Sequence, residues 1–113
     1  MDSNPFEGLP PETMRELQEA YRKGLPDKLK QIRMKLDALQ KEKSKELLTD
    51  LRFLVHKMAG SAGSFGYSAV SNICKTWEAQ IVAVLTSGEL DHSQLYRDSE
   101  RYFAEIQEKF SHV

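Results

Sequence analysis

The sequence contains almost no cysteine and no long apolar run. Cys74 is the single cysteine among 113 residues, which excludes an internal disulfide framework and a cysteine-rich zinc site. The apolar stretches are far shorter than the roughly 20 residues that a membrane-spanning helix needs. The first residues, Met1-Asp2-Ser3-Asn4-Pro5, lack the basic and apolar regions of a signal peptide. We therefore expect a cytoplasmic protein with no membrane-inserted segment.

Neither sign of charge is in excess. The 16 lysines and arginines stand against 17 acidic residues, which leaves a formal net charge of −1. A domain that binds nucleic acid through the phosphate backbone usually has a strongly basic balance, so we expect no nucleic-acid partner. A chain of 113 residues suits one domain and leaves no room for a catalytic domain beside a regulatory one.

Strand signals are weak, and helical signals are frequent. The chain has no sustained apolar/polar alternation and no Asn-Gly or Asp-Gly hairpin turn. Glycine and proline divide it into five helical segments, because Gly24 is expected to end the first and Pro26 suits the first turn of the second. The expected segments run over about 12–23, 26–43, 44–64, 68–87 and 91–110, with Ser44 as the N-cap of the third.

These segments predict an all-α fold, namely an antiparallel four-helix bundle with an extra short N-terminal helix. We expect residues 1–113 to form a single domain. Within it, residues 1–10 are a polar lead-in, 12–23 the accessory helix and 25–110 the four-helix bundle.

The third segment has an apolar stripe and one histidine outside it. At about 100° per residue, the stripe residues cluster on one side of the helix, and they read as core. His56 falls about 140° from the centre of that stripe, so its side chain should face solvent. The stripe consists of Leu47, Leu51, Leu54, Val55, Met58, Ala62 and Phe65.

Small residues surround this histidine. Gly60 and Gly63 each cost a helix about 1 kcal/mol relative to alanine. A face without side chains lets the backbone of another macromolecule come close to the imidazole, and an exposed aromatic ring would offer it an apolar contact. The predicted docking residues are Arg52, Phe53, Ala59, Gly60 and Gly63. In the rival interpretation the glycines allow a neighbouring helix to pack closely, and His56 is an ordinary surface residue.

The stretch from His56 to Tyr67, with Cys74 and the Trp77-Glu78 pair on the next helix, resembles the histidine phosphotransfer (HPt) domain family. The pattern that carries the resemblance is H-x-x-x-G-S-A-G-x-F-G. In that family a four-helix bundle displays one histidine, which takes a phosphoryl group from a phosphoaspartate and passes it to another receiver domain. The resemblance implies that His56 is the phosphoacceptor and that Gly60 permits receiver docking.

The sequence departs from the commonest form of this motif at one position. Many members carry lysine three residues after the histidine, where this chain has Ala59. Some members have a basic residue directly after the histidine instead, as Lys57 is here. Lys57 and Arg52 are therefore our candidates for balancing the charge of the phosphoryl group.

The resemblance also sets the expected partners and chemistry. Receiver domains of response regulators, or a sensor histidine kinase, are the expected partners, and the receiver would supply Mg²⁺. No Asp/Glu/His cluster at ligand spacing surrounds His56, so we expect neither a metal nor a cofactor of its own. Nothing near His56 in the sequence resembles a general base. We expect a monomeric carrier rather than an enzyme, because positioning and charge neutralisation dominate phosphoryl transfer.

The alternative function is a helical-bundle interaction module in which His56 is incidental. A helix-bundle metal enzyme is a third class, but the chain lacks the paired Glu-x-x-His ligands. We expect His92 and His112 to be uninvolved and Cys74 to be a buried thiol. The remaining basic group, Lys28, Lys30, Arg33 and Lys35, is expected to be a solvated helix face.

Overall fold

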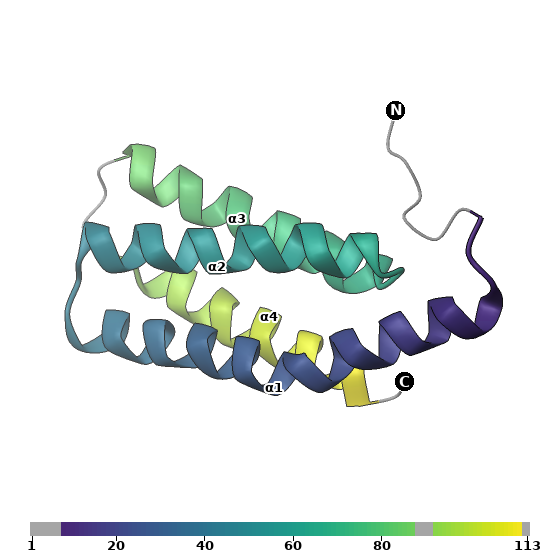
Figure 1. Ribbon diagram of the computed structural model, residues 1–113. Helices are drawn as coiled ribbons and strands as arrows, with labels where there is room; N and C mark the ends of the chain where they lie inside the picture. Colours follow the sequence, from purple (N-terminus) through teal and green to yellow (C-terminus); the bar gives the residue numbers. More distant parts are fainter. Residues whose placement is uncertain (1–7, 88–91, 112–113) are drawn as a thin grey trace.

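Each regular element in the computed structural model is an α-helix, over the residues that the structure describes, 8–87 and 92–111. The elements are α1 (Pro11–Lys41), α2 (Lys45–Ser64), α3 (Ser68–Ser87) and α4 (Ser93–Ser111). Each helix runs antiparallel to the one before it (Figure 1). The predicted all-α antiparallel four-helix bundle is confirmed. Residues 1–7 of the predicted lead-in and His112 lie outside the described residues.

The predicted break near Gly24 is wrong. Helix α1 continues from Pro11 to Lys41 with Pro26 inside it, so residues 12–23 extend the first bundle helix and do not form a separate accessory helix. A glycine and a proline inside a helix cost about 1 and 3 kcal/mol. Burial offsets this cost, because Tyr21 and Leu25 are only 6% and 2% exposed, and each such side chain contributes about 1.5–3 kcal/mol.

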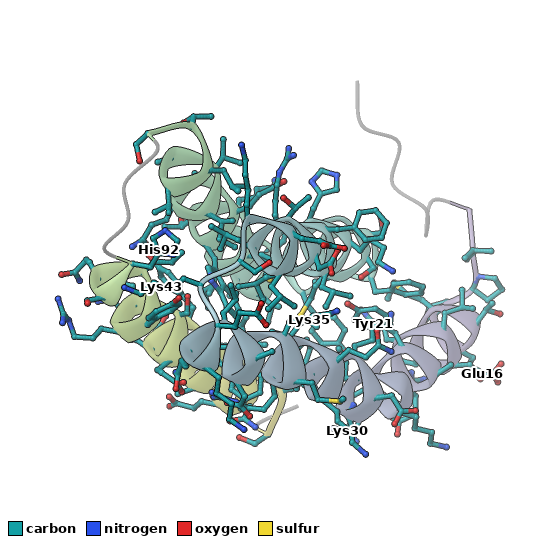
Figure 2. All side chains as sticks on the ribbon, turned by 90° about the vertical axis from the view of Figure 1, so that its left-hand side faces the viewer. Glu16, Tyr21, Lys30, Lys35, Lys43 and His92 are labelled. Atoms are coloured by element: carbon teal, nitrogen blue, oxygen red, sulfur yellow. The ribbon has the colours of Figure 1, made fainter. Side chains whose placement is uncertain are left out.

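The N-terminal half of α1 packs on the turn between α2 and α3. The Tyr21 ring stacks on Phe65 at a centroid distance of 4.7 Å and lies 5.8 Å from the Tyr67 ring. The Gln18 side-chain amide donates to the Phe65 carbonyl (2.8 Å), and the Tyr21 hydroxyl hydrogen-bonds Ser61 Oγ (2.8 Å). Figure 2 shows Tyr21 on the α2 side of α1 and Lys30 on the opposite side. These contacts anchor the N-terminal half of α1, and the helix is continuous through the segment where a break was expected.

Both ends of α2 are capped. Ser44 Oγ accepts from the Leu47 amide (3.2 Å), as predicted for an N-cap. At the other end Gly66 has φ 87°, a conformation that glycine adopts without penalty. The Tyr67 amide donates to the Ala62 carbonyl (2.8 Å) and the Gly66 amide to Gly63 (3.1 Å). This is a Schellman motif, and it turns the chain directly from α2 into α3.

The core lies between the four helices. The Trp77 side chain is fully buried and its Nε1–H donates to the buried Ser99 Oγ at 2.9 Å, so the indole carries no unpaired donor. Cys74 is also fully buried, which raises the pKa of its thiol to about 12 and confirms the prediction of a buried thiol.

In the basic group on α1, Lys28 and Lys30 are exposed as predicted, whereas Arg33 and Lys35 are half-buried and paired. Arg33 donates to Asp37 on α1 (2.6 Å) and to Glu100 on α4 (2.6 Å). Lys35 contacts Asp50 on α2 at 3.2 Å. This face of α1 therefore ties it to both neighbouring helices.

Candidate functional site

His56 lies in the middle of α2 on its outer surface. Its side chain is 66% exposed, whereas Val55 and Met58 on the same helix are 0% and 2% exposed. The orientation follows the helical periodicity of the sequence. The imidazole is thus carried on a rigid helix whose opposite side is anchored in the core.

The imidazole is held by a carboxylate from the neighbouring helix. His56 Nδ1 lies 2.9 and 3.0 Å from the two carboxylate oxygens of Glu78 on α3. An ionised carboxylate only accepts hydrogen bonds, so this contact places the proton on Nδ1. In the neutral imidazole the other nitrogen, Nε2, then keeps a free lone pair. The sequence does not indicate which ring nitrogen carries the proton. The hydrogen bond to Glu78 assigns the proton to Nδ1 and leaves Nε2 free.

Arg52 contacts the same carboxylate. It lies one turn before His56 on α2, and its Nε donates to Glu78 Oε2 at 3.3 Å. The Glu78 side chain is 17% exposed, against 49% for Arg52. The sequence predicted Arg52 on the exposed face beside His56, and the structure brings both to one acceptor on α3.

The sequence showed no group resembling a general base near His56, but the structure places the Glu78 carboxylate in contact with its Nδ1. The two residues are far apart in sequence, so no spacing on one helix could reveal the contact. Trp77 gives the reason for it: its ring is fully buried, and the next residue lies about 100° further round the helix. This rotation places Glu78 at the seam between α2 and α3. The only signal in the sequence was the Trp77-Glu78 pair within the motif.

The two glycines of the site have different surroundings. A Cβ on Gly60 would meet nothing within 4 Å, whereas one on Gly63 would lie 3.1 Å from Ser71 Oγ on α3. Close packing of α2 on α3 explains Gly63, as the rival interpretation held. No neighbour within the described chain explains Gly60, so the bare surface beside His56 is centred there.

Ala59 does not lie on the exposed face where the docking residues were predicted. Its side chain is 5% exposed, and its carbonyl accepts a 2.7 Å hydrogen bond from Ser71 Oγ. Ala59 lies on the α3 side of α2, where the interhelical contact covers it. The sequence could not fix this, because burial there depends on the position of α3 around α2.

The remaining predicted residues lie toward α1. The Phe53 side chain is 59% exposed, and the Lys57 Nζ lies 4.8 Å from its ring centroid. Lys57 also lines a 420 Å³ hollow between α1 and α2, and Phe53 lines an adjacent one of 340 Å³. Met34 borders the second hollow and is 62% exposed. We call Met34, Phe53 and these two hollows the α1–α2 groove.

The structure also gives the surroundings of the other groups that the sequence analysis considered. Among the residues that the structure describes, no three His, Cys, Asp or Glu side chains are grouped so that they could hold a metal ion. His92 lies at the start of α4 (Figure 2), with its ring against Tyr96 at 6.0 Å. No helix within 8–87 and 92–111 is long and apolar enough to cross a membrane.

Comparison with protein families gives one match that covers most of the chain. The family model of the Hpt domain matches residues 13–111. This range begins inside the N-terminal half of α1 and ends at the last residue of α4, so it contains the whole bundle and the His56 site. Neither the curated proteins nor the solved structures gave a match.

Proposed function

The chain belongs to the Hpt domain family, and we propose that it relays a phosphoryl group between aspartates of response-regulator receiver domains with His56 as the phosphoacceptor. Domains of this family are phosphocarrier modules of two-component signalling and interact with response regulators and histidine kinases. Like them, this chain is proposed to act as a carrier without a kinase or hydrolase centre.

The observation that carries the proposal is the contact between His56 Nδ1 and Glu78. It leaves Nε2 as the nucleophile on an exposed helix face. In the proposed step the Nε2 lone pair attacks the phosphorus of a receiver phosphoaspartate. The P–O bond breaks and its electron pair returns to the aspartate carboxylate. Nδ1 keeps its proton, which stays hydrogen-bonded to Glu78. The reverse step, with a second receiver aspartate as the nucleophile, passes the group on.

The surroundings of His56 support close approach of a receiver. Phosphoryl transfer depends on alignment and charge neutralisation, so the receiver backbone must come near Nε2. Gly60 leaves space there, and Phe53 offers an exposed apolar contact. We propose that the receiver binds over Gly60 and Phe53, flanked by Arg52 and Gly63. Mg²⁺ would be held by the acidic pocket of the receiver, and this chain would act as a cytoplasmic monomer.

Lys57 stays our candidate for balancing the phosphoryl charge. It follows His56 directly, and its long, flexible side chain can move from the Phe53 ring toward an incoming anion. Arg52 was the second candidate. Because its Nε is bonded to Glu78, we assign the direct role to Lys57 alone.

A second candidate function is an interaction module in which His56 is incidental. The two exposed apolar side chains of the α1–α2 groove, Met34 and Phe53, favour it, because a partner helix could bind there without any chemistry. The two functions differ in whether His56 forms phosphohistidine.

The decisive experiment is transfer from purified phosphorylated receiver domains to the wild-type chain, His56→Gln and His92→Gln. We expect acid-labile, base-stable label on the wild type and His92→Gln, and none on His56→Gln. Thermal unfolding verifies that all three chains fold. If the folded wild type takes no label from a broad receiver panel, the interaction module replaces the phosphocarrier. If a receiver still binds His56→Gln, docking and chemistry are separate properties of one face.

A further inference from the structure

One carboxylate serves two side chains of α2. Glu78 Oε2 lies 2.9 Å from His56 Nδ1 and 3.3 Å from Arg52 Nε. Arg52 and His56 are four residues apart, which places them on one face of the helix. Because Glu78 is largely shielded from solvent, with 17% of its side chain exposed, both contacts are less screened than those of a fully exposed pair. The negative charge that faces Nδ1 is therefore shared with a guanidinium.

The proton on Nδ1 governs how easily phosphohistidine breaks down. When the P–Nε2 bond breaks, its electron pair returns to Nε2 while a water or carboxylate oxygen bonds to phosphorus. A ring that carries the Nδ1 proton leaves as neutral imidazole. A ring without it would leave as an imidazolide anion, which is a much poorer leaving group. A carboxylate that holds the Nδ1 proton tightly thus makes the phosphoryl group more labile.

We propose that Arg52 is a positioning residue that lengthens the lifetime of phosphohistidine on His56 by drawing charge on Glu78 away from the Nδ1 proton. This inference rests on the proposed function. Arg52 does not touch the phosphoryl group in this account, and its effect passes through Glu78. Glu78 and Arg52 thus have opposing effects. Glu78 directs the phosphoryl group to Nε2, and Arg52 slows the breakdown of the phosphohistidine that results.

The other charged groups around Glu78 are placed differently. On α3 itself Lys75 lies one turn before Glu78, is exposed, and forms no ion pair within the described part of the chain. From α4, Asp98 accepts from Gln80 on α3 at 2.7 Å and contacts Arg101 at 3.7 Å. Among residues 8–87 and 92–111, Arg52 is the lysine or arginine that bonds the Glu78 carboxylate directly, which makes Lys75→Gln a matched control for loss of one nearby positive charge.

The test uses a small phosphodonor, so that receiver docking plays no part. Wild type, Arg52→Gln, Arg52→Lys and Lys75→Gln are phosphorylated with phosphoramidate, and loss of phosphohistidine is followed by ³¹P NMR across a pH series. We expect decay about two- to fivefold faster in Arg52→Gln, the factor that corresponds to one partly exposed ion pair. Arg52→Lys should restore most of the lifetime, and Lys75→Gln should match the wild type.

A second measurement excludes a merely structural effect. In ¹⁵N spectra of the phosphorylated ring, Nδ1 should lose its proton at higher pH in Arg52→Gln than in the wild type. Equal lifetimes and equal Nδ1 titrations in these two chains would overturn the proposal. So would a Lys75→Gln chain that decays as fast as Arg52→Gln, because the effect would then be one of general charge. A folded wild type that takes no phosphoryl group on His56 refutes the proposed function instead.

Discussion

Gly63 and Ser71 lie so close that a Cβ on the glycine would come within 3.1 Å of the serine Oγ. That hydroxyl is already committed, since it donates to the Ala59 carbonyl at 2.7 Å. The Ser71 hydroxyl cannot move away from such a Cβ without weakening its hydrogen bond to Ala59, which links α2 to α3. At Gly60, one turn earlier, a Cβ would enter open space. The two glycines of the site therefore provide a comparison in which helix propensity is the same and packing differs.

Gly60→Ala should stabilise the protein, and Gly63→Ala should stabilise it less or not at all. Both substitutions gain about 0.5–1 kcal/mol of helix propensity, but at Gly63 the new methyl group must displace Ser71. Urea unfolding of the two variants beside the wild type measures the difference in free energy. An equal gain at both positions would show that Gly63 is not fixed by its contact with α3.

Gly60→Gln should block transfer from a receiver while leaving the imidazole reactive. The new side chain would fill the bare surface beside His56, where alignment to within about an ångström decides the rate. We expect receiver-dependent transfer to fall at least tenfold and labelling by phosphoramidate to stay near the wild-type rate. Ala104→Gln adds the same side chain to an exposed position of α4 and serves as the control. Equal losses with both donors would place the defect in the imidazole rather than in docking.

Tyr21→Ala should destabilise the whole bundle by about 3–5 kcal/mol, the cost of truncating a buried aromatic ring. Tyr21 is 6% exposed and stacks on Phe65, so its loss frees both the N-terminal half of α1 and the α2–α3 turn. Circular dichroism at 222 nm during thermal unfolding measures the effect. An unchanged midpoint with a small loss of helix signal would instead indicate an independent accessory helix over 12–23.

The pair of Arg33 and Glu100 should make part of the stability depend on pH. Hydrogen bonds from Arg33 hold the pKa of Glu100 below its ordinary value of 4.5. A lowered carboxylate pKa in the folded state stabilises the protein above the ordinary value, and this contribution is lost as pH falls through the lowered pKa. Because the Glu100 side chain is 44% exposed, solvent screening keeps the effect below about 1 kcal/mol.

Glu100→Gln is the variant that checks this dependence. Urea unfolding is measured at pH values from neutral to about 3. Above pH 4.5 the two free energies of unfolding should run parallel, and below it that of Glu100→Gln should fall less steeply with pH than that of the wild type. Glu108→Gln removes an exposed carboxylate of α4 that has no ion pair within the described residues and is the control. Parallel curves for wild type and Glu100→Gln would contradict a stabilising role of the Arg33 contact.

Periodicity along one helix was predictable from the sequence, and relations between helices were not. The outward position of His56 and the burial of Leu51, Val55 and Met58 follow from 3.6 residues per turn. The burial of Ala59 and the contact of Glu78 with His56 depend on how α3 is rotated against α2. No pattern within a single helix encodes that rotation.

The continuity of α1 was missed for a related reason. Gly24 and Pro26 are local signals for a break, and their local energies are unfavourable. What overrides them is the packing of Tyr21 and Gln18 against Phe65, a residue of the turn after α2. Local helix propensity favoured a break at Gly24 and Pro26. The tertiary contacts of Tyr21 and Gln18 favoured a continuous helix, and they outweigh the local cost.

The bond between Glu78 and His56 joins two separate helices, so the nitrogen that would react in the proposed transfer is determined by the assembled bundle. An unfolded chain has both ring nitrogens in the tautomeric exchange of free imidazole and would form both isomers of phosphohistidine. The ratio of the two isomers therefore reports on folding. In a mixed population, only molecules in which α2 and α3 are correctly paired would produce the Nε2 isomer alone.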